Sequence, residues 1–144
     1  NYDSVITDAQ WAAIHSWTGV AVGERDIASL AGIEHFTAMT TLNCSQNSLS
    51  TLDLSANTAL QELYCDQNQL TELDLSHNVA LQKLSCNRNQ LPSQTVAPLA
   101  KLTLLDCGDN QLTALDVSGS TALVHLYLAN NRLKALDVTQ NAAL

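Results

Sequence analysis

The chain has 144 residues, a length that suits one domain built around one core. Hydrophobic residues make up 46% of it but aromatic residues only 4%, which favours a thin core of stacked aliphatic layers. The formal net charge of −8 argues against nucleic acid as the main partner, and no apolar run approaches the ~18 residues of a bilayer span, so we expect no membrane insertion.

The first 38 residues do not fit the periodic pattern that follows, and we predict that residues 1–38 form a helical N-terminal cap. The stretch from Thr7 to Gln10 has the form of a capping box and predicts a helix from Asp8 to about Ser16. A second short helix is predicted around Arg25 to Leu30, before a glycine. The two tryptophans of the chain would then shield the first part of the repeat core from water.

From Met39 onward the sequence repeats every 21 residues. The pattern LxxLxCxxNxLxxLDLSxNxA occurs five times, in residues 39–59, 60–80, 81–101, 102–122 and 123–143, and Leu144 opens a sixth copy. A strict period of this length marks a solenoid, in which each repeat is one coil stacked on the next. Apolar and polar residues alternate in both LxC and LDL, as in half-buried strands.

This pattern resembles the leucine-rich repeat family, and within it the bacterial type with 21 residues per repeat, over residues 39–144. The resemblance implies an α/β solenoid, a right-handed coil with parallel strands on its concave face. We expect short extended segments on the opposite face, because the second half of each repeat carries the same alternation. Helical caps are common at the N-termini of such proteins, which agrees with the cap predicted above.

One repeat departs from the pattern, and the last one ends without a lid. In residues 92–101 the expected LDLS is replaced by PSQTVAPLAK, where Ser93 could cap a helical turn that Pro98 ends. We interpret this departure as variation on the outer face rather than a partner site. A bare last coil would expose apolar surface and strand edges, so we expect the native chain to continue past Leu144.

Three columns of equivalent residues invite a chemical interpretation, and for each we favour a structural one. The cysteine column is continued by Leu128, so the position needs an apolar side chain rather than a thiol, and thiols in a row cannot converge on one zinc ion. The asparagines suit buried turns, and the aspartates suit bonds to backbone N–H groups, with calcium bridging as the alternative. The columns are Cys44, Cys65, Cys86 and Cys107; Asn47, Asn68, Asn89, Asn110 and Asn131; and Asp53, Asp74, Asp116 and Asp137.

No motif points to catalysis. The four histidines share no spacing, and the chain has no GxSxG, HExxH or glycine-rich phosphate loop. We therefore expect a protein that is not an enzyme, with no cofactor and no metal ligands.

Function is expected in the variable columns beside the apolar ones, which face solvent on the strands. Tyrosine and arginine often anchor interfaces, so Tyr64, Arg88 and Tyr127 are the predicted anchors. The other predicted ligand-binding residues surround them: Glu62, Asp66, Lys83, Asp106, Asp109 and His125.

We predict an interaction module that binds a protein, or alternatively a glycan, through its concave face. The alternatives are a structural spacer and a calcium-dependent adhesion domain of a larger bacterial surface protein. A place at the cell surface or outside the cell is what the family resemblance implies.

Overall fold

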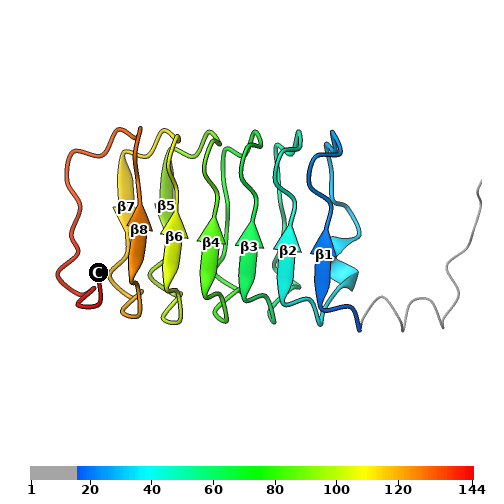
Figure 1. Cartoon of the computed structure of the whole chain (residues 1–144), viewed down its shortest axis with the longest axis horizontal. Helices are drawn as coiled ribbons and strands as arrows, with labels where there is room; N and C mark the ends of the chain where they lie inside the picture. Colours follow the sequence, from blue (N-terminus) through cyan, green and yellow to red (C-terminus); the bar gives the residue numbers. More distant parts are fainter. Residues whose placement is uncertain (1–15) are drawn as a thin grey trace, which may run out of the picture.

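The computed structural model describes residues 16–144, which form a rod of stacked coils (Figure 1). Its front is a six-stranded parallel sheet in the order β1-β2-β3-β4-β6-β8, and behind it lies a two-stranded sheet of β5 and β7. The front strands are β1 (Gly19–Ala21), β2 (Thr41–Asn43), β3 (Glu62–Tyr64), β4 (Lys83–Ser85), β6 (Leu104–Asp106) and β8 (His125–Tyr127). The back strands are β5 (Ser93–Thr95) and β7 (Ala114–Asp116).

Each front strand places its central residue inward, which is Val20 in β1 and a leucine in the other five. Leu42, Leu63, Leu84 and Leu105 lie side by side in register and are fully buried. The four cysteines that follow the strands are fully buried as well, as predicted from the repeat. Because alternate residues of a strand face the same side, the alternation in LxC places both the leucine and the cysteine in the core.

The asparagine column joins each coil to the one before it, which confirms its predicted structural role. The side-chain amide of Asn68 donates to the carbonyls of Cys65 at 3.1 Å and, in the preceding coil, of Cys44 at 3.0 Å. Its oxygen accepts the N–H of Leu49 at 3.0 Å. Asn89, Asn110 and Asn131 repeat this arrangement, so backbone groups buried in the turns find partners.

The helical N-terminal cap is wrong for the described part of residues 1–38. The first predicted helix falls almost entirely outside the described residues, and the second, Arg25 to Leu30, is not a helix. The only helical turn there is η1 (Ile33–His35), a single 3-10 turn. The oxygen of Asn47 accepts the N–H groups of Arg25 at 3.1 Å and Ile27 at 2.9 Å, so these donors cannot bond within a helix.

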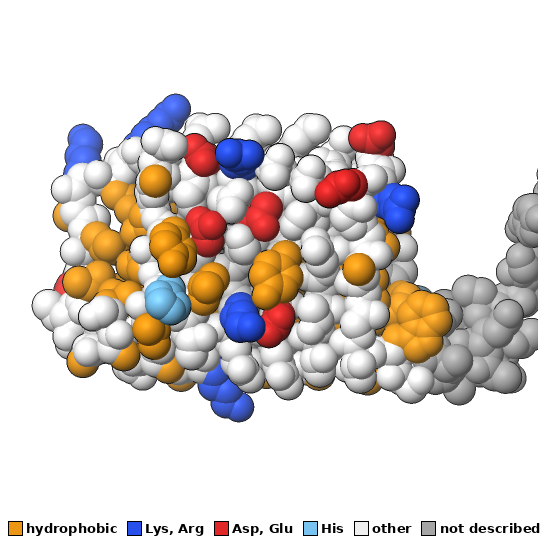
Figure 2. Space-filling model, in the orientation of Figure 1, with side chains coloured by type: hydrophobic (Ala, Val, Ile, Leu, Met, Phe, Trp, Pro, Cys, Tyr) orange, Lys and Arg blue, Asp and Glu red, His pale blue; other side chains and the backbone are white. Residues whose placement is uncertain are grey.

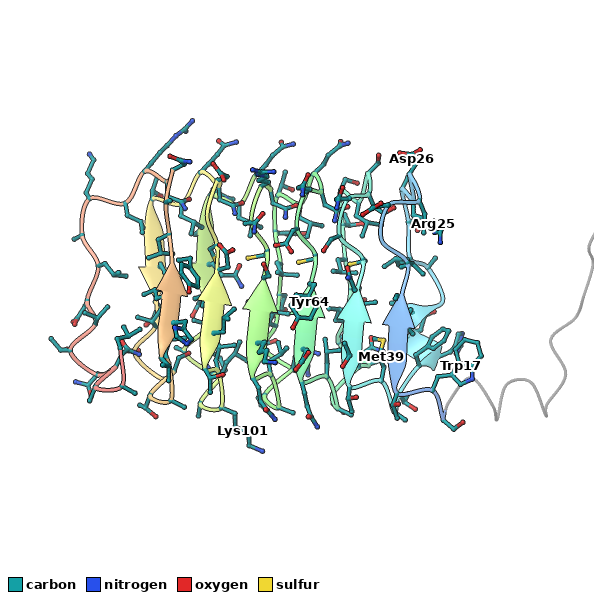
Figure 3. All side chains as sticks on the ribbon, in the orientation of Figure 1. Trp17, Arg25, Asp26, Met39, Tyr64 and Lys101 are labelled. Atoms are coloured by element: carbon teal, nitrogen blue, oxygen red, sulfur yellow. The ribbon has the colours of Figure 1, made fainter. Side chains whose placement is uncertain are left out.

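Residues 18–38 instead form a further coil of the solenoid. Strand β1 pairs with β2 in parallel, and Val20 and Val22 pack against the core. Trp17, at the β1 end of the stack (Figure 3), contacts Phe36 with ring centroids 5.8 Å apart but is still 53% exposed. It covers this end of the core only in part.

The irregular repeat also differs from the prediction. Ser93 does not cap a helical turn but begins β5, which pairs in parallel with β7. Gln94 and Val96 are buried and Thr95 between them is exposed, so the segment keeps the period of two without the LDLS residues. The expected extended segments on the back are confirmed as a sheet in these two coils.

A glycine in the next coil compensates for the irregular repeat. A Cβ on Gly119 would lie 1.8 Å from the carbonyl oxygen of Ala97, whereas the equivalent places in other repeats hold Ala56, His77, Pro98 and Gln140. The close approach therefore belongs to these two coils alone and requires the absence of a side chain.

We predict that Gly119→Ala lowers the free energy of unfolding by at least ~1–3 kcal/mol, because backbone must move to relieve the overlap. Gly19→Ala is the matched control, since a Cβ there meets nothing within 4 Å. Urea unfolding followed by circular dichroism measures both. Equal stability of the two variants would contradict the packing of Gly119 on Ala97.

We predict that Asn68→Leu costs ~1–3 kcal/mol or more, because it leaves the buried N–H of Leu49 without its acceptor. The control is Asn78→Leu in the second asparagine row. The carbonyls that accept the side-chain amide of Asn78 also accept backbone N–H groups, and the side-chain oxygen of Asn78 has no hydrogen-bond partner, so leucine there leaves no backbone group unpaired. The equivalent position in the next coil is already a leucine, Leu99. Urea unfolding should show the larger loss for Asn68→Leu; the reverse order would contradict the account of this row.

Candidate functional site

All nine predicted binding residues lie on one face, which we call the sheet face. It consists of the outward side chains of β3, β4, β6 and β8 and of the turns that follow them. Figure 2 shows apolar side chains gathered on this face with acidic and basic groups around them. Ligand binding by these nine residues and the concavity of the face both stay predictions.

Three of the nine residues form one network across β3 and β4. Lys83 donates to one carboxylate oxygen of Glu62 at 2.9 Å, and the Tyr64 hydroxyl donates to the other at 3.0 Å. The hydrogen bond from Lys83 lowers the pKa of Glu62, and the carboxylate raises the pKa of Lys83. Burial, followed by the bond to Glu62, raises the pKa of Tyr64. Tyr64 lies over the sheet (Figure 3), and the bond to Glu62 fixes the position of its hydroxyl.

The two aspartates above the strands are fixed by neighbouring coils. Asp66 accepts the hydroxyl of Ser85 and the N–H of Asn87, the latter at 2.9 Å. Asp106 accepts the side-chain amide of Asn87 at 3.0 Å and the N–H of Gly108 at 3.0 Å. Both carboxylates therefore sit in a preformed polar row along the rod.

A shallow depression of about 450 Å³ brings four predicted residues together. Its lining comprises Gln67, Asn87, Arg88, Asp106, Gly108, Asp109, Tyr127 and Ala129. The Nε of Arg88 lies 3.7 Å from Asp109, which also accepts the amide of Asn130 at 2.7 Å. Arg88 and Asp109 both have left-handed backbones, with φ of 51° and 49°.

The C-terminal end of the sheet face is apolar and exposed. His125 and Tyr127 stack with ring centroids 6.4 Å apart, and Tyr127 is 53% exposed. Leu104 pairs with His125 in register and is only half-buried, although it was not among the predicted site residues. The sequence signal for Leu104 is an aliphatic residue in a column whose side chains face outward.

The aspartate column bonds backbone, as predicted. Asp53, Asp74, Asp116 and Asp137 each accept the N–H two residues on, at 2.9–3.0 Å. These bonds lower the pKa of all four carboxyls. Among residues 16–144 no group of three or more His, Cys, Asp or Glu side chains could hold a metal ion.

The cysteine column is chemically protected. All four thiols are free and buried, and the sulfur atoms of Cys86 and Cys107 lie 3.2 Å apart. Burial raises the pKa of Cys44 to about 12 and that of Cys65 well above its ordinary value. The hydrogen bond with Cys107, together with burial, does the same for Cys86.

We predict that a thiol reagent at pH 8 labels the native protein slowly, because the thiolate is the reactive form and burial suppresses it. Labelling counted by mass spectrometry should reach four thiols per chain only after urea is added. Complete labelling of the native protein within seconds would contradict the inward direction of the column.

Comparison with known proteins agrees with this geometry. No protein-family model and no curated protein matches the sequence. Among solved structures, the functional domain of InlJ from Listeria monocytogenes, described as including a cysteine ladder, is 38% identical with a TM-score of 0.90, over 93% of this chain and 30% of that one. The internalin InlF of the same species is 21% identical with a TM-score of 0.70, over 96% of this chain and 48% of its own.

A leucine-rich repeat protein of Leptospira interrogans shares the fold at 19% identity and a TM-score of 0.57, over 96% of this chain and 50% of that one. The chain therefore spans half or less of the length of these three structures. Its parallel sheet, asparagine row and inward leucines define a leucine-rich repeat solenoid. The chain belongs to the bacterial leucine-rich repeat family.

Proposed function

We propose that this protein is an interaction module that binds a protein ligand through the sheet face, and that it is not an enzyme. The observation that supports this most directly is a set of fixed aromatic and charged side chains on one side of a rigid sheet. Tyr64 and Tyr127 occupy equivalent places on β3 and β8, three strand spacings or roughly 14 Å apart. Leucine-rich repeat folds of this kind commonly mediate protein–protein interactions.

The chemistry of the sheet face favours a protein over a glycan as the ligand. The half-buried Leu104 lies on β6, between the strands that carry the two tyrosines, and gives the face an apolar centre. The polar row of Asp66 and Asp106 borders it. An apolar centre with anchoring tyrosines and a polar rim is the usual anatomy of a protein interface.

The extent of the recognition unit and its location in the cell are also proposals. All nine binding residues fall within residues 39–144, which we take as the recognition unit, with residues 1–38 preceding it. The similarity to internalins supports a place at the cell surface or outside the cell. Among the described residues no helix is long and apolar enough to cross a membrane.

The test uses peptides selected from a random phage-displayed library on the immobilised wild-type protein. We expect Tyr64→Ala with Tyr127→Ala to weaken binding of most selected peptides at least about tenfold, since buried tyrosines carry much of the energy of an interface. Biolayer interferometry measures the Kd, and urea unfolding checks that the fold is retained.

Val79→Ala with Val138→Ala is the matched control. It removes two exposed apolar side chains that do not lie on the sheet face. Peptides that bind both double variants as tightly as the wild type would place recognition elsewhere and reject this site.

A further inference from the structure

We propose that the face opposite the sheet face is a second docking surface, which accepts a short extended segment of a partner that carries lysine or arginine side chains. We call this surface, over residues 29–98, the back groove. It goes beyond the proposed function, because none of the nine residues of the sheet face contributes to it.

The back groove consists of three adjoining grooves, each of about 450–480 Å³. The first lies between residues 29–34 and 51–53, the second between 51–55 and 72–77, and the third between 71–76 and 92–98. Asp53 lines both the first and the second groove, and Asp74 both the second and the third. Shared walls make them one surface that crosses successive coils.

The floor of the back groove is apolar. Leu52, Leu73 and Leu75 line it, and Pro92 and Pro98 form part of the wall around the irregular repeat. Strand β5 pairs with β7 only, so the side of β5 that faces residues 71–76 is a sheet edge. A buried side chain, Gln94, spans this gap by donating to the carbonyl of Leu73 at 3.2 Å.

The rim of the back groove is acidic, with His77 as the only basic side chain in the lining of the three grooves. Glu34, Asp53, Glu72 and Asp74 line it and are exposed, whereas no lysine or arginine does. Of the three ion pairs in residues 16–144, one involves Glu34, with His35, and none involves the other three carboxylates. Charge complementarity over an apolar floor therefore selects a cationic, partly apolar partner.

The aspartates of the rim are held rigidly. Asp53 and Asp74 accept the N–H groups of Ser55 at 3.0 Å and Ser76 at 2.9 Å. The bonds to these serines, with a smaller contribution from His77, lower the pKa of both carboxyls. Both therefore carry a fixed negative charge at neutral pH, one strand spacing apart.

The length of the back groove sets the size of its occupant. Four coils contribute, so the surface extends over three spacings, or roughly 14 Å. An extended chain rises about 3.3 Å per residue, which corresponds to about four or five residues. Alternate side chains of such a segment could contact the floor and the carboxylates.

The test uses a fluorescein-labelled peptide, Lys-Val-Lys-Ala-Lys-Val-Lys, and fluorescence anisotropy at low salt. We expect saturable binding to the wild type and a loss of roughly tenfold in affinity for the triple variant Asp53→Asn, Glu72→Gln, Asp74→Asn, as expected for three surface charge pairs. Asparagine still accepts the N–H two residues on, so the turns survive the change.

The control is a triple variant with the same change in net charge outside the back groove: Asp26→Asn, Asp116→Asn and Asp137→Asn. Asp116 and Asp137 make the same turn bonds as the groove aspartates. We expect less than about a twofold change, since screened charges at a distance contribute little. NMR shifts of the wild type should map to residues 51–55, 71–76 and 92–98. Equal losses in both triples, or no saturable binding, would overturn the proposal.

Discussion

The structure depends on one side chain per coil, the asparagine that bonds its own turn and the coil before it. A stacked turn has backbone groups that water cannot reach, and each needs a partner within the protein. The side-chain NH2 of Asn68 donates to three carbonyl oxygens, and its side-chain oxygen accepts one backbone N–H. These partners belong to two coils. Because one side chain serves two coils, a shift of register would leave buried groups unpaired, and the column keeps the coils aligned.

Alignment of the coils has a direct consequence for the proposed recognition. Outward side chains from different repeats stand in straight rows, so Glu62 meets Lys83 across β3 and β4, and Asn87 lies between Asp66 and Asp106. These contacts order the side chains in the free protein, which would reduce the entropic cost of the proposed binding. The two faces differ: the sheet face is mixed in charge, whereas the back groove is acidic. A rod of this kind can present two chemically distinct surfaces.

The errors in the sequence interpretation have a common cause. Val20 precedes its partner Leu42 by 22 residues rather than 21, so the first coil falls out of step with the repeat, and its sequence predicts a helical cap instead. The conformation of this coil is decided by Asn47, whose side-chain oxygen accepts the backbone N–H groups of Arg25 and Ile27. Likewise Ser93 suggested a helical turn, but pairing with the strand of the next coil made it extended. In both segments, hydrogen bonds between the backbone and a neighbouring coil prevailed over the local sequence signals for a helix.

By itself, the sequence determined the period, the buried columns and the face on which Tyr64, Arg88 and Tyr127 lie, because a period of two within a period of 21 leaves no other way to bury leucine and cysteine together. Only the tertiary structure decided which outward residues touch. It placed Arg88 beside Asp109 and Tyr127, formed the back groove between successive coils, and required a glycine at position 119 opposite Ala97. Those features depend on distances between coils and on left-handed turns, which a one-dimensional pattern does not contain.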